Sequence, residues 1–196
     1  MRIQIVHCHP LTESFDHALF LAIVETLRSN GHEVVATDLY REGFQPAMTE
    51  SERRSYMGND YDLRAVASYA ETLRKVDGLI LCFPHWWFTM TAVLKGWVDR
   101  VWGPGVAFTY DPTDNHLRPA LHNIKLFGVV TSYGSPWWIV HFFAGNAGYK
   151  VLMRGMKPLC AGDARSFYLA EYGMDASTPR SRQAFLERVR RRVSQV

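Results

Sequence analysis

Short apolar runs alternate with amphipathic segments along most of the chain, and this alternation predicts strands separated by helices. The third run is apolar throughout, as expected of a central parallel strand that is covered on both faces, and Pro84 is expected to end it. The predicted strands are residues 2–8, 33–38, 78–83 and 126–131, with a fifth within residues 156–168.

Capping residues and helical spacing predict the helices between these strands. The expected helices are residues 15–29, capped by Ser14 and ended by Asn30-Gly31, then 62–75, 91–102 and a terminal helix that begins at Pro179. Phe185, Val189 and Val193 share one face of that terminal helix. Thr49-x-x-Glu52 predicts a short capped helix, residues 103–123 a loop or hairpin, and residues 139–153 a poorly defined helix.

Strands that alternate with helices predict one α/β domain over residues 1–196, a doubly wound parallel sheet with strand order 2-1-3-4-5. Ligands bind such sheets beyond the carboxyl ends of the strands, at the switch point between strands one and three. We therefore expect the loops after Cys8, Phe83 and Thr131 to converge on a site.

Composition supports a single compact domain and a reducing compartment. The chain has 196 residues, of which 47% are hydrophobic and 21% charged. Cys8, Cys82 and Cys160 are far apart and form no C-x-x-C pair, which argues against a disulfide framework and a zinc site. We expect a cytoplasmic protein, because no apolar run reaches the roughly 20 residues of a membrane span and the first residues lack a signal-peptide pattern.

The net charge of +3 is concentrated at the end of the chain. From Arg180 onward the chain has six arginines and one acidic residue, Glu187, so the remainder of the chain is slightly acidic. A basic last helix is more often a solvated face than a nucleic-acid stripe, and we expect no nucleic-acid partner.

The loop after the first strand, residues 9–16, has the character of an anion site. It carries several hydroxyls and leads into a helix N-terminus, where free N–H groups and the helix dipole favour a phosphate. An ordinary loop with Ser14 as a helix cap explains the segment equally well. The segment is neither a Walker loop nor a G-x-G-x-x-G turn, which argues against a P-loop NTPase and against a Rossmann-type dinucleotide site.

Two later loops are unusually aromatic. Trp86 and Trp87 follow the third strand, and Trp137 and Trp138 follow the fourth. A single tryptophan is usually part of a core, but four at converging positions favour a planar ligand with a phosphate tail. His7 and His9 alternate on one strand without a third ligand at a recognisable spacing, so we expect no metal.

Two sequence blocks carry a resemblance to a known family. They are His9-Pro10-x-x-x-Ser14-Phe15 and Phe83-Pro84-x-x-Trp87-Phe88-x-Met90-x-Ala92-x-Leu94-Lys95-Gly96-Trp97-x-Asp99-Arg100-Val101. Together they resemble the flavodoxin-like NAD(P)H:quinone oxidoreductases of the DT-diaphorase type. The resemblance extends from the first strand through the fourth and implies a flavodoxin-like fold, a bound FAD (with FMN as the alternative) and a homodimer with its site at the interface. It also implies ping-pong hydride transfer from NADH or NADPH through the flavin to a quinone.

The resemblance also assigns roles to individual residues. Those implied for the cofactor are His9, Ser14, Phe15 and Asp16 at the phosphates, Pro84, His85, Trp86, Trp87 and Phe88 along the isoalloxazine, and Thr131, Ser132, Tyr133, Gly134 and Ser135 at its pyrimidine side. Asp16 stands where the family often has Asn. Those implied for catalysis are Trp87 and Phe88 as the platform, with Tyr133 and His141 as charge relays because Ile139 and Gly145 occupy the family's relay positions. Those implied for substrate contact are Phe108, Tyr110, Trp137 and Trp138.

Two alternatives to the quinone reductase remain open at this stage. An FMN azoreductase or nitroreductase differs only in pocket shape. A flavin-binding ancillary subunit of a potassium efflux system would use the segment 106–110 or the basic terminal helix as a docking surface. Turnover of reduced nicotinamide without any partner distinguishes the enzymes from the regulator, whereas a one-electron carrier fits poorly because the chain is mildly basic and the site aromatic.

Overall fold

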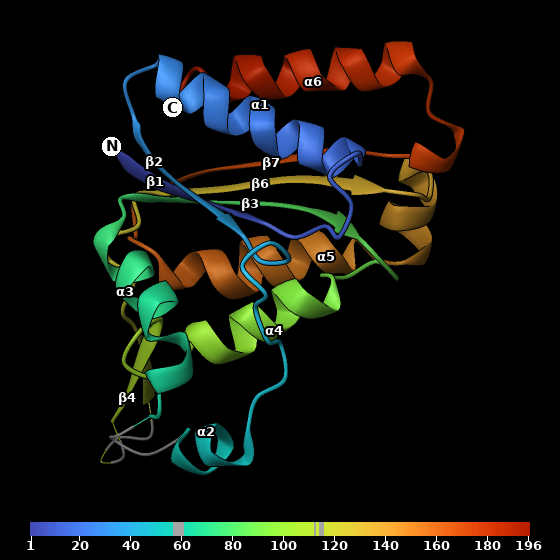
Figure 1. Cartoon of the computed structure of the whole chain (residues 1–196). Coiled ribbons are helices and arrows are strands. Elements are labelled where there is room, and N and C mark those ends of the chain that lie inside the picture. Colours follow the sequence, from blue (N-terminus) through green and yellow to red (C-terminus); the bar gives the residue numbers. More distant parts are fainter. Residues whose placement is uncertain (57–60, 112, 114–115) are drawn as a thin grey trace.

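A parallel sheet between two helical layers forms the centre of the protein (Figure 1). The computed structural model describes residues 1–56, 61–111, 113 and 116–196. The strands, in spatial order, are β2 (Glu33–Asp38), β1 (Arg2–His7), β3 (Gly78–His85), β6 (Leu126–Tyr133) and β7 (Arg165–Glu171), and all neighbours are parallel. This order confirms the predicted doubly wound, flavodoxin-like arrangement.

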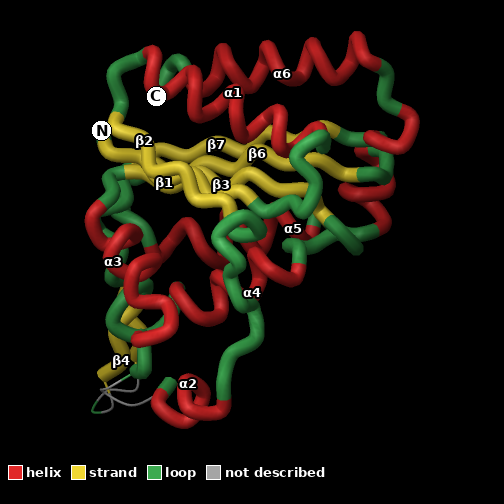
Figure 2. Tube along the Cα trace, in the orientation of Figure 1, coloured by secondary structure: helices red, strands yellow, loops and turns green. Residues whose placement is uncertain are grey.

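Helices cover both faces of the sheet (Figure 2). One face carries α1 (Phe15–Ser29) and α6 (Pro179–Val193), which also contact each other. The other face carries α3 (Ala67–Lys75), α4 (Ala92–Val101) and the short α5 (Ala147–Tyr149). The capped helix α2 (Glu50–Ser55) and the hairpin of β4 (Phe108–Asp111) and β5 (His116–Pro119) lie farther from the sheet, in the lower part of the view.

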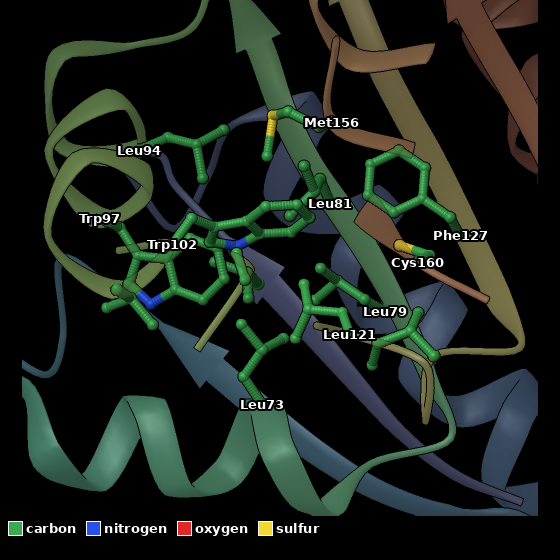
Figure 3. Packing of buried hydrophobic residues seen from close by; sticks show 14 of the residues in the cluster. Leu73, Leu79, Leu81, Leu94, Trp97, Trp102, Leu121, Phe127, Met156 and Cys160 are labelled. Atoms are coloured by element: carbon green, nitrogen blue, oxygen red, sulfur yellow. The ribbon is translucent and has the colours of Figure 1, made fainter. Parts of the chain in front are cut away.

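Alternating side chains of the strands supply two hydrophobic cores. Ile3 and Ile5 of β1 face α1 and α6, whereas Val6 faces the other layer. The second layer is closed by α4, whose Trp97 is fully buried in the same hydrophobic cluster as Leu81 (Figure 3). β3 is buried along its whole length, so the unbroken apolar sequence of residues 78–83 follows from cover on both faces.

Local signals in the sequence predicted most element boundaries correctly. Ser14 accepts a hydrogen bond from the His17 N–H and caps α1, and Gly31 follows that helix with φ +80°. The Thr49–Glu52 capping box is present at α2, and the segment 103–123 contains the β4–β5 hairpin. The terminal helix buries the three residues predicted for its core face, which are Phe185, Val189 and Val193.

Four of the predicted strands have wrong boundaries. β3 and β6 each run two residues farther than predicted because His85 pairs with Tyr133 at their ends, and Pro84 lies inside β3. A proline costs little there because the missing N–H falls next to the end of the strand. β7 begins only at Arg165 and ends at Glu171, beyond the predicted segment. β1 ends at His7 rather than Cys8.

Two predicted helices are irregular, the first of them as its poorly defined pattern indicated. The segment after β6 consists of π-helical turns at Ile139–Phe143 and Lys150–Met156 on either side of α5. Gly145 and Asn146 interrupt it with positive φ values of 60° and 53°. The predicted helix 62–75 begins as a 3-10 turn before α3. No described helix has the length and apolar character needed to cross a membrane, and the three cysteines are buried and free.

Candidate active site

A cavity of about 630 Å³ opens at the carboxyl ends of β1, β3 and β6, where the topology places a ligand site. Its wall combines the start of α1, the turn after β3, the loop after β6 and a short helix after β7. The lining residues are His9, Ser14, Phe15, Asp16, Pro84, His85, Trp86, Trp87, Phe88, Ser132, Tyr133, Gly134, Ser135, Met174 and Asp175. This volume lies within the range of about 300–1,000 Å³ that is usual for small-molecule and cofactor sites.

The N-terminus of α1 forms one end of the cavity. Ser14 caps the helix, since its Oγ accepts from the His17 N–H at 3.1 Å and its carbonyl accepts from the Ala18 N–H. The first turn of a helix leaves further N–H groups without intrahelical partners, and here they belong to Phe15 and Asp16. This end of the cavity therefore suits an anionic group.

Asp16 is a buried carboxyl in the wall of the cavity. Its two oxygens accept hydrogen bonds from the Ser132 hydroxyl, at 3.1 and 2.8 Å, so the bond ties α1 to β6. Burial raises the pKa of Asp16 from the ordinary 3.8 to about 6, although the Ser132 bond acts in the opposite direction. Because the Ser132 hydroxyl donates to the Asp16 carboxylate, this carboxylate repels a nearby anion less strongly.

We expect the free energy of unfolding to fall as the pH rises from about 4 to about 7, because the folded state binds the Asp16 proton more tightly than the unfolded state. The pKa difference corresponds to about 3 kcal/mol. Asp16→Asn keeps a partner for Ser132 and removes this loss. Urea titrations of the chain, of D16N and of the surface control D163N measure the trend, and an unchanged pH slope in D16N would contradict the assignment.

A tight turn of aromatic residues closes the end of β3. Trp86 and Thr89 exchange two backbone hydrogen bonds, each of 3.2 Å, around Trp87 and Phe88. These two central residues have φ values of +53° and +62°, which is the geometry of a type I′ turn that normally uses Asn and Gly. Each such non-glycine residue costs about 1–3 kcal/mol, and strain of this kind concentrates at functional sites. Trp87 is 92% exposed, so its ring has little protein to pack against.

A stack of rings forms the floor beneath this turn. His85 stacks on Tyr133 at 4.2 Å between ring centroids, and Tyr133 stacks on Tyr172 at 5.2 Å. The Tyr133 hydroxyl lies 2.7 Å from the hydroxyl of Tyr168, and burial raises the pKa of both phenols. Gly148 approaches so closely that a Cβ there would lie 2.1 Å from His85 Nε2. The Tyr133 hydroxyl is therefore held within the protein as a neutral group.

The hydrogen bonds of His85 define its tautomer. The Thr131 hydroxyl donates to the Phe83 carbonyl at 2.6 Å, so it can only accept from His85 Nδ1 at 2.7 Å. Nε2 consequently carries the lone pair, and among the described residues this buried atom has no hydrogen-bond partner. Burial lowers the pKa of His85 to about 3, so the ring is neutral.

The structure gathers most of the predicted cofactor residues and leaves the predicted substrate residues elsewhere. Thirteen of the fourteen cofactor residues line the cavity, and Thr131 lies behind it inside β6. Phe108 and Tyr110 lie on the β4 strand of the hairpin, toward the opposite end of the sheet (Figure 1). Trp137, Trp138 and His141 lie on the exposed segment after β6 and are absent from the lining.

A run of aromatic contacts nevertheless connects His141 to the cavity wall. His141 donates from Nδ1 to the Trp137 carbonyl at 2.9 Å and stacks on the Trp137 ring at 4.4 Å. Its ring also lies 5.5 Å from that of Tyr172, which in turn stacks on Tyr133. Tyr172, and Met174 and Asp175 of the cavity wall, were not among the predicted site residues, although the loop after the last strand had to reach the same edge of the sheet.

Comparisons with known proteins agree with this fold. The family model described as "Flavodoxin-like fold" matches residues 1–193. Human ribosyldihydronicotinamide dehydrogenase (quinone) is 31% identical over 181 residues, which cover 77% of this chain and 78% of the human protein. Rat NAD(P)H dehydrogenase (quinone) 1 is 34% identical over 150 residues, which cover 68% of this chain and 54% of the rat protein.

Solved structures give the same result. NAD(P)H:quinone oxidoreductase from Methanothermobacter marburgensis has a TM-score of 0.82 and 27% identity, with 99% of this chain and 96% of that chain covered. An azoreductase from Bacillus anthracis, at 16% identity and a TM-score of 0.77, shares the fold. The matches span between 45% and 59% of the length of three curated relatives, including the uncharacterized NAD(P)H oxidoreductase YcaK of Escherichia coli. The chain belongs to the flavodoxin-like fold family Flavodoxin_2, with NAD(P)H:quinone oxidoreductases among its homologues.

Proposed function

We propose that this chain is a flavin-dependent NAD(P)H:quinone oxidoreductase that reduces a quinone or a similar small acceptor by two electrons in a ping-pong reaction. The observation that carries the proposal is the cavity, which combines an anion-binding helix N-terminus, a strained aromatic turn and a glycine-containing loop. Membership of a family with quinone reductase homologues supports the same activity.

The lining of the cavity fits the two chemical ends of a flavin. His9 and the N–H groups at the start of α1 are suited to the phosphate, and Ser14 keeps that helix start in place. Trp86, Trp87 and Phe88 provide an aromatic wall for a planar ring system. At Gly134 a Cβ would lie 2.9 Å from the Asp175 carboxylate, so a larger residue would have to displace this side chain of the cavity wall.

A bound flavin supplies the hydride chemistry, and the chain supplies position and electrostatics. We assign the backbone N–H groups of Gly134 and Ser135 to stabilise negative charge that develops at the ring edge. Tyr133 is a positioning residue in this proposal, because its hydroxyl is bonded to Tyr168 and its ring is held between His85 and Tyr172. The relay role predicted for His141 stays a prediction and would act through Tyr172.

We propose FAD as the resident flavin, with FMN as the alternative, and NADH or NADPH as the donor. The resemblance to the DT-diaphorase type favours FAD. Some FMN-bound structures share this fold at 14% and 18% identity, which is too distant to transfer their cofactor. Chromophore release decides between the two flavins.

We further propose that the active form is a homodimer. Trp138, Phe142 and Phe143 are 58%, 77% and 86% exposed on one short segment, and large exposed apolar side chains in a group are typical of interaction surfaces. Phe108 and Tyr110 lie away from the cavity of their own chain, so their predicted contact with substrate requires the cavity of a second copy. Light scattering on the purified chain measures the oligomeric state.

The visible absorption spectrum of the purified chain tests the proposed function. We expect a flavin spectrum that bleaches when NADH or NADPH is added without oxygen and recovers when a quinone follows. A chain that is colourless and takes up neither added FAD nor added FMN would contradict the proposal.

The same assay separates the alternative functions. Faster recovery with azo or nitro compounds than with quinones would favour an azoreductase or nitroreductase. A bound flavin that reduced nicotinamide does not bleach would favour the ancillary subunit of a potassium efflux system.

A further inference from the structure

Three potential metal ligands meet outside the lining of the cavity, at the ends of two strands. His7 and Asp38 are the last residues of β1 and β2 and pair directly in the sheet register. His17 lies in the first turn of α1, which packs over this end of the sheet. One ligand atom from each side chain lies within 4.8 Å of the others. The spacing along the chain gave no hint of this set, because strand pairing and the path of the first loop bring it together.

His7 is oriented as metal-binding histidines are. It is fully buried, and its Nδ1 lies 3.1 Å from the Cys82 backbone carbonyl, which can only accept a hydrogen bond. The proton of the neutral ring is therefore on Nδ1, and Nε2 presents its lone pair to the cluster. The ring also packs flat against Phe20, with 4.7 Å between centroids. In metal sites a histidine ligand usually donates the N–H of its other ring nitrogen to a carbonyl or a carboxylate, as His7 does here.

The distance between two nitrogens of the imidazoles matches the distance between two ligands of one metal ion. His17 Nδ1 lies 3.3 Å from His7 Nε2. Two nitrogens that each lie about 2.0–2.1 Å from a tetrahedral zinc ion are separated by about 3.3 Å. The two rings thus already stand at the distance that a shared ion requires.

Asp38 supplies the third ligand from the neighbouring strand. Its Oδ1 accepts hydrogen bonds from the Tyr40 and Arg41 N–H groups, at 3.1 and 3.2 Å, which fix the carboxylate at the end of β2. Oδ2 is the oxygen that these backbone bonds leave for an ion. Asp38 and His17 are half-buried, so a water molecule can complete the coordination from the solvent side.

We propose that His7, His17 and Asp38 form a binding site for a divalent transition-metal ion, with Zn²⁺ as the representative ion. Two imidazoles and one carboxylate suit zinc or its first-row neighbours, whereas Ca²⁺ and Mg²⁺ prefer oxygen ligands. The bound ion joins the first turn of α1 to the ends of β1 and β2. Because Asp16 and Ser14 of the cavity lie on the same turn, the ion would also stiffen one end of the proposed flavin site.

The metal-free form has a distinct arrangement of protons. Since His7 Nε2 presents a lone pair, the contact with His17 requires a proton on His17 Nδ1 in the absence of an ion. An ion that binds both nitrogens displaces this proton, and the neutral His17 ring then carries its proton on Nε2. This change of tautomer is observable by nitrogen-15 NMR of the imidazoles and does not depend on a flavin or on turnover.

Zinc titration of the untagged chain against a chromophoric chelator tests the site. We expect one equivalent of Zn²⁺ per chain and at least about tenfold weaker binding in H17Q and in D38N, which is about 1.4 kcal/mol or more. Asparagine at position 38 keeps an oxygen for the two backbone N–H groups, so D38N isolates the loss of charge. H122Q removes an exposed histidine elsewhere and serves as the matched control.

Two further readouts make the result decisive. Zn²⁺ should raise the Tm of the unaltered chain and of H122Q but not that of H17Q or D38N, since only a ligand bound to the folded state shifts stability. The imidazole spectra of the unaltered chain should show the His17 tautomer change even if a variant fails to fold. Equal zinc affinity in all variants, or an unchanged His17 tautomer at saturating zinc, would overturn the proposal in favour of a simple hydrogen bond between the two rings.

Discussion

Trp87→Ala should weaken flavin binding by about 10- to 100-fold, or about 1.4–2.8 kcal/mol, while the chain keeps its fold. The ring of Trp87 is 92% exposed in the protein and lines the cavity, so its main contribution is to a bound planar ligand. Loss of the ring removes apolar contact area and aromatic stacking from the bound state alone. Fluorescence titration with FAD and with FMN measures the effect, and denaturant unfolding checks the fold.

Two variants separate the role of the ring from the strain of the turn. Trp87→Gly also lacks the ring but relieves the cost of φ +53°, so we expect flavin binding as weak as in W87A together with about 1 kcal/mol greater stability. Leu21→Ala truncates a half-exposed side chain that does not line the cavity and should leave binding unchanged. Normal flavin binding in W87A, or recovery of binding in the glycine variant, would contradict the proposed platform.

Arg100→Met should lower the free energy of unfolding by about 3–5 kcal/mol, because it leaves a buried carboxylate without its partner. Arg100 and Glu52 are 4% and 2% exposed, and Arg100 donates from Nε and Nη2 to Glu52 Oε1 at 2.8 and 2.7 Å. Arg100 Nη1 also donates to the Gln45 carbonyl, so the guanidinium joins α4 to the segment around α2. Urea unfolding measures the change.

A surface pair on the same helix provides the control for this prediction. Lys95 and Asp99 of α4 form an exposed ion pair, and Lys95→Met should change stability by no more than about 0.5 kcal/mol. The double variant R100M/E52Q removes the unpaired charge and should recover part of the loss seen in R100M. Equal changes in the free energy of unfolding in R100M and K95M would contradict the prediction that the buried Arg100–Glu52 pair matters more than the exposed pair.

The pH dependence of this pair has a defined sign. Burial acts to raise the pKa of Glu52, but hydrogen bonds from Thr49 and Arg100 prevail, and the pKa lies below the ordinary 4.5. The stabilisation is therefore complete above that ordinary value and is lost as the pH falls through the lowered pKa. This trend is opposite to the one expected for Asp16, so D16N and R100M should alter the acid limb of the stability profile in different directions.

The parts of the fold that were predicted correctly depend on neighbours in the chain. The apolar run of β3, the capping box at α2 and the N-cap of α1 each depend on residues that are close together in the sequence. Strand order also followed from the sequence, because alternation of strands and helices leaves few right-handed arrangements. The same topology placed the cavity at the switch point and brought thirteen of the fourteen predicted cofactor residues to its wall.

The features that were missed depend on partners far away in the sequence. β3 and β6 extend to His85 and Tyr133 because each provides the other with a ladder partner, which no local pattern of either segment reveals. The poorly defined helix predicted after β6 is a π-helical segment that Gly145 and Asn146 interrupt with positive φ, and its exact form was not predicted.

The sequence by itself determined the class of the fold, the edge of the sheet that holds the cavity and the chemical character of its loops, because periodicity, caps and composition act locally. Only the tertiary structure decided how the chemistry is arranged. It joined Asp16 to Ser132, held the aromatic turn in its strained form, and brought His7, His17 and Asp38 together. Each of these arrangements depends on burial and on the pairing of distant strands, and these exist only once the chain has folded.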